Sequence, residues 1–268
     1  MALNLAFETV GSGPPMLVLH GLFGSSSNWR GVARQLASTH TVHSVDLRNH
    51  GASPWADSMD YVSMADDVLQ LMDRLGLQRP AVLGHSMGGK TAMALALRHP
   101  QRVGRLIVVD IAPVSYADTL TPFAEAMRGA DVVAAATRAE VQARLRQAVP
   151  DPAVVPFLMQ NLVVQNDHFD WRLNLMGISA SMSQLCGFPS ELLGAHFAGR
   201  VAVIAGEHSD YVTESDGVEF RPMFPRVAVE VIEDAGHWVH ADQPDAFLAC
   251  VRRALRESSQ TVLADRVH

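Results

Sequence analysis

The chain has 268 residues, of which 48% are hydrophobic and 18% are charged, and its formal net charge at pH 7 is −7. This length can bury a sizeable core, and a mixed helix-and-strand chain of this size is commonly one domain with an insertion. The acidic residues form no block of like charge, which argues against nucleic acid and membrane surfaces as partners.

Cysteine usage and the N-terminal residues bear on the compartment. Cys186 and Cys250 are too few for a disulfide framework, have no metal-ligand spacing, and are expected to be buried. The first residues lack the basic and apolar regions of a signal peptide. No apolar run approaches the ~20 residues of a membrane helix. We therefore expect a soluble, cytoplasmic protein, and the sequence leaves monomer and homodimer both open.

Short apolar, β-branched runs alternate with longer helical patterns along much of the chain. This alternation predicts an α/β fold with a mostly parallel central sheet and helices on both faces. Helical segments are predicted at 64–75 and 90–98. The predicted strands are 16–20, 41–46, 81–84, 106–110, 201–205 and 227–232.

The alternation stops between about residues 113 and 198. Helix-like, Ala-rich segments at 123–136 and 139–148 occur there, interrupted by prolines. We predict that 114–198 is a helical cap inserted in a core made of 1–113 and 199–268. The polar residues from Glu257 onward are expected to fray.

A candidate nucleophile lies in the pentapeptide Gly-His-Ser-Met-Gly at residues 84–88. The motif follows an apolar strand and opens a helical run, which is the setting of a nucleophile elbow. Such a sharp turn needs small neighbours, and Gly84, Gly88 and Gly89 provide them. We therefore predict that Ser86 is the nucleophile.

The loop His-Gly-Leu-Phe-Gly at residues 20–24 follows the first predicted strand. In enzymes with a nucleophile elbow, such a loop donates one backbone N–H to the oxyanion and the residue after the nucleophile donates the other. We predict Leu22 and Met87 as donors, with Phe23 as the substitute for Leu22. His20 is expected to hold the loop in place.

The general base should follow the last strand, in the chain order serine, acid, histidine. Among 12 histidines, His237 comes after the predicted strand 227–232 and next to Gly236, which lets the loop aim the imidazole. His240 is expected at the start of the last helix, facing elsewhere. His85 is expected to be a buried structural group.

The acid departs from the common pattern. The usual position, on the loop after strand 201–205, is occupied by Ser209, and Asp210 is one place late. Asp110 ends the strand before the predicted cap, and a carboxylate there can reach a histidine from a neighbouring direction. The residues alone leave both aspartates open, with Asp110 the stronger candidate.

Several motifs together resemble those of YbfF-type esterases, small α/β-hydrolases with a helical cap. The resemblance runs from about Leu3 to Arg253, and the variants at 48–51 and 88–90 make it specific. It implies an esterase or thioesterase without a cofactor or metal, and an acid at Asp110. The runs that carry it are 20–25, 46–54, 84–90, 110–113, 171–174 and 235–240.

These residues predict hydrolysis of small-molecule esters or thioesters through an acyl-enzyme on Ser86. Phe23 and Trp238 are expected to contact the substrate, and the apolar cap favours an apolar acyl chain. Residues 46–51 are expected to support the elbow, whereas Trp171 and Arg172 fit either the pocket mouth or cap packing. The alternatives are carbon–carbon bond hydrolysis by the same triad and a catalytically slow ligand receptor. Haloalkane dehalogenation is excluded because it needs a carboxylate where Ser86 stands.

Overall fold

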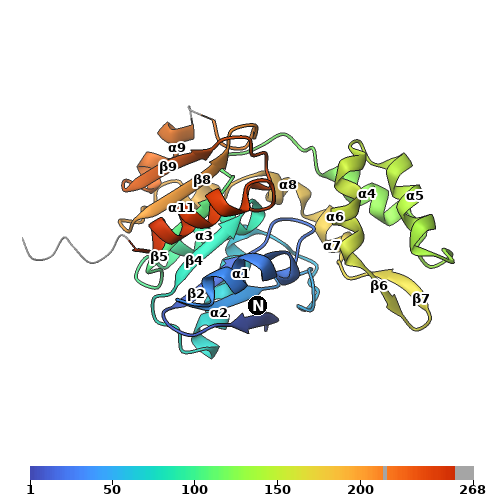
Figure 1. Cartoon of the computed structure of the whole chain (residues 1–268), viewed down its shortest axis with the longest axis horizontal. Coiled ribbons are helices and arrows are strands. Elements are labelled where there is room, and N and C mark those ends of the chain that lie inside the picture. Colours follow the sequence, from blue (N-terminus) through green and yellow to red (C-terminus); the bar gives the residue numbers. More distant parts are fainter. Residues whose placement is uncertain (214–215, 257–268) are drawn as a thin grey trace, which may run out of the picture.

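A seven-stranded, mostly parallel sheet forms the centre of the computed structural model, which describes residues 1–213 and 216–256 (Figure 1). The strand order is β1-β3-β2-β4-β5-β8-β9, and only β1 is antiparallel to its neighbour. The strands are β1 (Phe7–Val10), β2 (Pro15–Leu19), β3 (Thr41–Val45), β4 (Ala81–His85), β5 (Arg105–Val109), β8 (Val201–Gly206) and β9 (Val227–Ile232).

The six strands predicted from buried apolar runs are present, and their ends differ by one residue at most. The edge strand β1 was missed because three of its four residues are exposed, so it lacks an apolar run. Its backbone nevertheless pairs with β3, from Phe7 opposite Val45 to Val10 opposite Val42. Backbone pairing at an edge therefore escapes a search for hydrophobic runs.

Helices cover both faces of the sheet, as predicted. On one face, α1 and α11 pack Leu36 and Phe247 against strand residues such as Met16 and Ile107. On the other face, α2, α3 and α9 pack a larger apolar layer. These helices are α1 (Arg30–Leu36), α2 (Tyr61–Arg74), α3 (Met87–Arg98), α9 (Asp216–Met223) and α11 (Pro244–Arg256), with the short α10 (Val239–Asp242) before α11.

The chain between β5 and β8 lies to one side of the sheet (Figure 1). We keep the predicted limits, 114–198, and call this segment the cap. Its α4 is shorter than predicted, because the helix stops at Gly129. The cap helices are α4 (Thr121–Gly129), α5 (Arg138–Ala148), α6 (Val155–Leu158), α7 (Leu175–Ala180) and α8 (Met182–Cys186).

The cap also contains a β-hairpin that the sequence analysis missed. Strands β6 (Leu162–Gln165) and β7 (His168–Trp171) pair antiparallel around Asn166 and Asp167. Both turn residues have positive φ, of 49° and 62°, which Asn and Asp tolerate better than most residues. The Asn-Asp pair was thus the sequence feature that could have indicated the turn. It was missed because the flanking residues are largely exposed and form no apolar run.

The predictions about membrane helices and about the cysteines can be compared with the described residues. No helix in 1–213 or 216–256 is long and apolar enough to cross a membrane. Cys186 and Cys250 are free and buried, as expected. The fraying predicted from Glu257 falls outside the described residues. The cytoplasmic location stays a prediction.

Candidate active site

The turn between β4 and α3 has the strained geometry of a nucleophile elbow. Ser86 has φ of 52° and ψ of −118°, a conformation that non-glycine residues rarely adopt. A Cβ atom on Gly84 would lie 2.1 Å from the Gly88 carbonyl oxygen, and one on Gly88 would lie 2.4 Å from Leu19 O. The glycines are therefore required by close backbone contacts, as the motif predicted.

The loop after β2 packs directly against this elbow. A Cβ atom on Gly21 would lie 2.9 Å from His85 Nδ1 and 3.3 Å from Ser86 Cβ. Leu22 and Phe23 follow it and are both buried, and Phe23 has a positive φ of 62°. The predicted oxyanion loop thus lies beside the serine that it would serve.

The hydrogen bonds of the loop separate Leu22 from Phe23. The Phe23 N–H donates to His50 Nε2 at 3.1 Å, so it is already occupied. Within the described residues, neither the Leu22 nor the Met87 N–H has a hydrogen-bond acceptor. Met87 is also the first residue of α3, where the helix leaves its N–H groups unpaired. These two amides are the pair that the sequence analysis proposed.

Residues 46–51 hold the oxyanion loop rather than the elbow itself. His50 donates from Nδ1 to the Arg48 carbonyl at 2.9 Å, which leaves Nε2 to accept from Phe23. Burial lowers the pKa of His50 to about 3, so the ring stays neutral. Asp46 accepts the Ser26 N–H at 2.6 Å, farther along the same loop. The expected supporting role therefore falls on the loop.

His20 has the structural role that was predicted for it. Its Nδ1 donates to the Gly21 carbonyl at 2.8 Å, and its Nε2 accepts the Leu47 N–H at 3.0 Å. Burial lowers the pKa of His20, so both ring nitrogens are committed in a neutral ring. It has no free nitrogen for proton transfer.

Asp110 and His237 meet at the carboxyl ends of the strands. His237 Nδ1 lies 2.7 Å from Asp110 Oδ2, and Asp110 is fully buried. The Gly206 N–H donates to Asp110 Oδ1 at 3.0 Å, and the Ser209 hydroxyl donates to Oδ2. Asp110 has a positive φ of 51°, an uncommon backbone conformation that clusters at functional sites.

Asp210, the competing acid, lies elsewhere. Its side chain is exposed on the loop after β8, whereas its neighbour Ser209 is turned toward Asp110. Ser209, at the usual acid position, therefore contacts the Asp110 carboxylate without supplying a carboxylate of its own. Ser209 was not predicted to have a role, although it occupies the usual position of the acid in the sequence pattern.

Ser86 and His237 line one cavity, which also includes Leu22, Phe23 and Trp238. With Nδ1 bonded to Asp110, His237 has Nε2 available for the serine proton. No hydrogen bond joins Ser86 Oγ to His237 in the part of the chain that the structure describes. Such bonds commonly tighten only when substrate binds.

Two further histidines surround the base. His85 is buried, and its Nε2 donates to the His237 carbonyl at 2.9 Å, which agrees with a structural role. The expectation that His240 faces elsewhere was wrong: it lines the cavity and stacks on Trp29 with ring centroids 4.4 Å apart. Burial lowers the pKa of His240 to about 4, so it is neutral. Its place follows from α10, a short helix before α11 that the sequence analysis did not predict.

The cavity has a volume of about 950 Å³ and lies between the cap and the core. Cap side chains such as Leu120, Phe123 and Phe157 form an apolar wall. The other end passes between α1 and α11, where Asp242 and Asp245 face it. The described lining residues include these two aspartates and no lysine or arginine, an arrangement that disfavours anionic ligands.

Two cap residues suggested by the sequence do not line this cavity. Trp171 is buried and donates from Nε1 to the Met127 carbonyl at 2.9 Å, within the cap. Arg172 is exposed. Trp171 therefore packs within the cap and does not shape the pocket mouth.

The buried Asn161 connects the cap to the oxyanion loop. Its side-chain amide donates to the Phe23 carbonyl at 2.8 Å.

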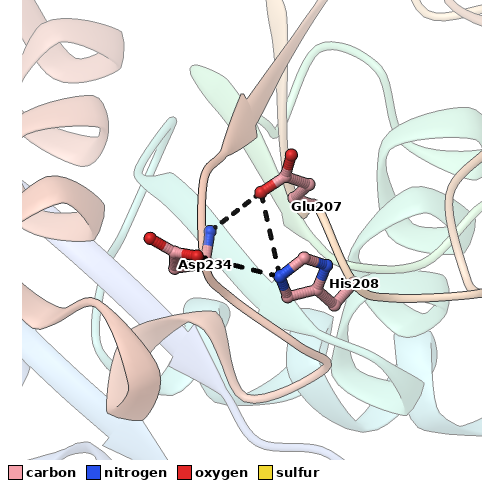
Figure 2. A group of neighbouring side chains, drawn as sticks. All are labelled: Glu207, His208 and Asp234. Atoms are coloured by element: carbon pink, nitrogen blue, oxygen red, sulfur yellow. Dashed lines mark hydrogen bonds and ion pairs between the residues drawn. The ribbon is translucent and has the colours of Figure 1, made fainter.

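Glu207, His208 and Asp234 form an exposed group beside the site (Figure 2). It is the one set of three histidine or carboxylate side chains, among those the structure describes, close enough to share a metal ion. The Asp234 N–H donates to Glu207 Oε2 at 3.0 Å, and His208 lies 3.9 Å from each carboxylate. These contacts link the loop that carries Ser209 to the loop that carries His237.

Comparison with family models gives a match to the α/β-hydrolase fold over residues 14–244. The chain is 38% identical over 247 residues to the sn-1-specific diacylglycerol lipase ABHD11 of Xenopus laevis, covering 89% of this chain and 78% of that protein. It is 34% identical over 264 residues to the esterase YbfF of Escherichia coli, covering 96% of this chain and all of that one.

A solved structure agrees with these sequence matches. An esterase from a marine microorganism superposes with a TM-score of 0.90 at 34% identity, covering 94% of this chain and 99% of that chain. A thermophilic esterase from Thermogutta terrifontis superposes with a TM-score of 0.71 at 25% identity, covering 95% of this chain and 93% of that one. The resemblance carried by the sequence motifs therefore extends over the whole fold.

Proposed function

Since the chain belongs to the α/β-hydrolase family and is a carboxylic ester hydrolase of the YbfF and ABHD11 type, we propose that it works through Ser86, His237 and Asp110. The observation that carries this assignment is the 2.7 Å contact between His237 Nδ1 and the buried Asp110 carboxylate, at the cavity that Ser86 lines.

The proposed cycle is a two-step acyl transfer. His237 Nε2 takes the proton of Ser86 as Oγ attacks the ester carbonyl carbon, and the Leu22 and Met87 amides bind the resulting oxyanion. His237 then gives its proton to the leaving alcohol or thiol, and an acyl-enzyme remains. A water molecule, deprotonated by His237, attacks the acyl-enzyme and releases the acid. Asp110 holds the histidine tautomer and stabilises the imidazolium in both steps.

Replacing Ser86 by Ala tests the nucleophile. Hydrolysis of p-nitrophenyl esters should fall to background, and a fluorophosphonate should label the wild-type Ser86 peptide but not the variant. Ser27→Ala is the matched control. Ser27 is another serine that lines the cavity, but it is not part of the nucleophile elbow. Activity retained by Ser86→Ala would overturn the assignment.

We further propose that the substrates are uncharged esters or thioesters with an apolar acyl chain, acylglycerols being one example. Leu120, Phe123 and Phe157 support the apolar chain, and the carboxylates of Asp242 and Asp245 disfavour an anionic leaving group. The ABHD11 relative carries the name of a diacylglycerol lipase.

A substrate panel tests this second proposal. Diacylglycerols and p-nitrophenyl octanoate should be hydrolysed with a higher kcat/KM than octanoyl-coenzyme A. The variant Asp245→Asn should raise kcat/KM for the anionic thioester and leave the neutral esters unchanged. A preference of the wild type for the anionic thioester would contradict the proposal. Products of a diketone panel would reveal the alternative carbon–carbon bond chemistry.

A further inference from the structure

Lysine occurs once in this sequence, at position 90, and every other basic side chain among the 21 Lys and Arg residues is an arginine. Lys90 lies on α3, one turn after Ser86, and its own N–H donates to the Ser86 carbonyl at 3.1 Å. The side chain is buried, with 1% of its surface exposed. The acyl-transfer cycle gives this residue no role.

The Lys90 ammonium binds the two segments through which the cap meets the core. Nζ donates to Val114 O at 2.8 Å, where the cap begins. It also donates to Cys186 O at 3.2 Å and to Gly187 O at 2.6 Å, at the end of α8. Figure 1 shows α8 beside the core, whereas α4 and α5 lie farther out.

These contacts suit lysine better than arginine. An ammonium presents three N–H donors around one point, and here three carbonyl oxygens converge on that point. Tyr61 and Tyr116 add their rings, with centroids 5.6 Å and 4.7 Å from Nζ. Among the described residues no carboxylate pairs with Nζ, and burial lowers the pKa of Lys90 to about 7. A planar guanidinium would spread its donors and leave a carbonyl unpaired.

The first of these segments leads directly into the apolar wall of the cavity. Leu120 and Phe123 follow Val114 closely in the chain and line the cavity. The two junctions are also tied to each other, because the Tyr116 N–H donates to Cys186 O at 2.9 Å. A shift of the Lys90 contacts would therefore move the cap wall relative to Ser86.

We propose that Lys90 is a positioning residue that sets acyl-chain selectivity by joining both cap junctions to the nucleophile helix. The inference rests on the proposed function, since it assumes that the acyl chain lies under the cap. A long chain contacts the cap wall, whereas an acetyl group needs only Ser86, His237 and the oxyanion amides. Loss of the Lys90 contacts should therefore penalise long-chain esters selectively.

The first test compares Lys90→Met with the wild type on p-nitrophenyl acetate and octanoate. The ratio of kcat/KM for octanoate to that for acetate should fall about tenfold, chiefly through KM for octanoate. Lys90→Arg should show the same loss of selectivity, because arginine keeps the charge but not the point geometry. An equal loss on both esters, or no change in the ratio, would overturn the proposal.

The second test does not depend on catalysis. Hydrogen exchange measured by mass spectrometry should show faster exchange in Lys90→Met for peptides covering 114–118 and 182–190. Peptides from β4 and β5 should exchange as in the wild type. Unchanged exchange at the junctions would refute the proposed role of Lys90, whatever the chain hydrolyses. If Ser86 proved not to be the nucleophile, the exchange difference between Lys90→Met and the wild type would still be expected. If Lys90→Met fails to fold, Tyr61→Phe, which removes the hydroxyl bond to Leu185 O, weakens the same junction and should lower the same ratio.

Discussion

His237 Nδ1 lies 2.7 Å from Asp110 Oδ2, although 127 positions separate the two residues in the chain. The contact crosses from the end of β5 to the loop after β9, and β8 lies between the two strands in the sheet. Asp110, the proposed acid, thus follows a strand next to β4, and the loop after β8 supplies Ser209, which binds the Asp110 carboxylate.

Asp110→Asn should lower kcat by about 10⁴-fold, because an amide favours the wrong histidine tautomer. Asp210→Asn should leave kcat within about twofold, since its exposed side chain is not among the groups bonded to Asp110. Steady-state kinetics on p-nitrophenyl esters measure both. The reverse order of effects would assign the acid to Asp210.

Ser209→Ala should lower kcat about tenfold, because a hydrogen bond to a charged group is worth roughly 1.5–3 kcal/mol and Asp110 would lose one. The double variant Asp110→Asn, Ser209→Asp moves the carboxylate to the position that Ser209 occupies beside Asp110 Oδ2. It should recover at least about tenfold of the activity lost in Asp110→Asn. Recovery in Asp110→Asn, Ser209→Ala would show that the carboxylate is not the cause.

Gly88→Ala should lower the free energy of unfolding by about 3 kcal/mol, because the new Cβ meets backbone oxygens that cannot move independently. The nearest of these, Leu19 O, would lie 2.4 Å away. Gly31→Ala is the matched control: nothing lies within 4 Å of its Cβ position, in α1. It should raise stability by up to about 1 kcal/mol. Urea unfolding measures both values, and equal effects would contradict the packing argument.

Stability should fall as the pH is lowered below about 6.5, partly through His50. Burial holds the folded pKa of His50 at about 3, against an ordinary value of 6.5. Between these values the unfolded chain binds a proton that the folded chain does not, so the free energy of unfolding rises with pH. From pH 6.5 to pH 5, one such histidine contributes about 1.6 kcal/mol.

His50→Gln tests this linkage by urea unfolding at several pH values. The slope of stability against pH should become shallower by about one proton across this range. An unchanged slope in His50→Gln would show that His50 is not the group that titrates on unfolding.

Local chemistry made much of this protein predictable from its sequence. The elbow needs glycines around Ser86, and buried parallel strands need apolar runs. Both features can therefore be recognised from a few neighbouring residues. The edge strand β1 and the hairpin turn at Asn166 and Asp167 are harder to recognise from sequence, because exposed strands need no continuous apolar face.

The nucleophile motif, the candidate oxyanion loop, the candidate base and the alternation of core strands and helices could be predicted from sequence, because each depends on residues close together in the chain. Tertiary structure decided the contacts between distant segments. It brought Asp110 rather than Asp210 to His237, committed the Phe23 amide to His50, turned His240 into the cavity, and gathered both cap junctions on Lys90. Such contacts depend on how strands and loops are placed in space, which no local spacing of residues encodes.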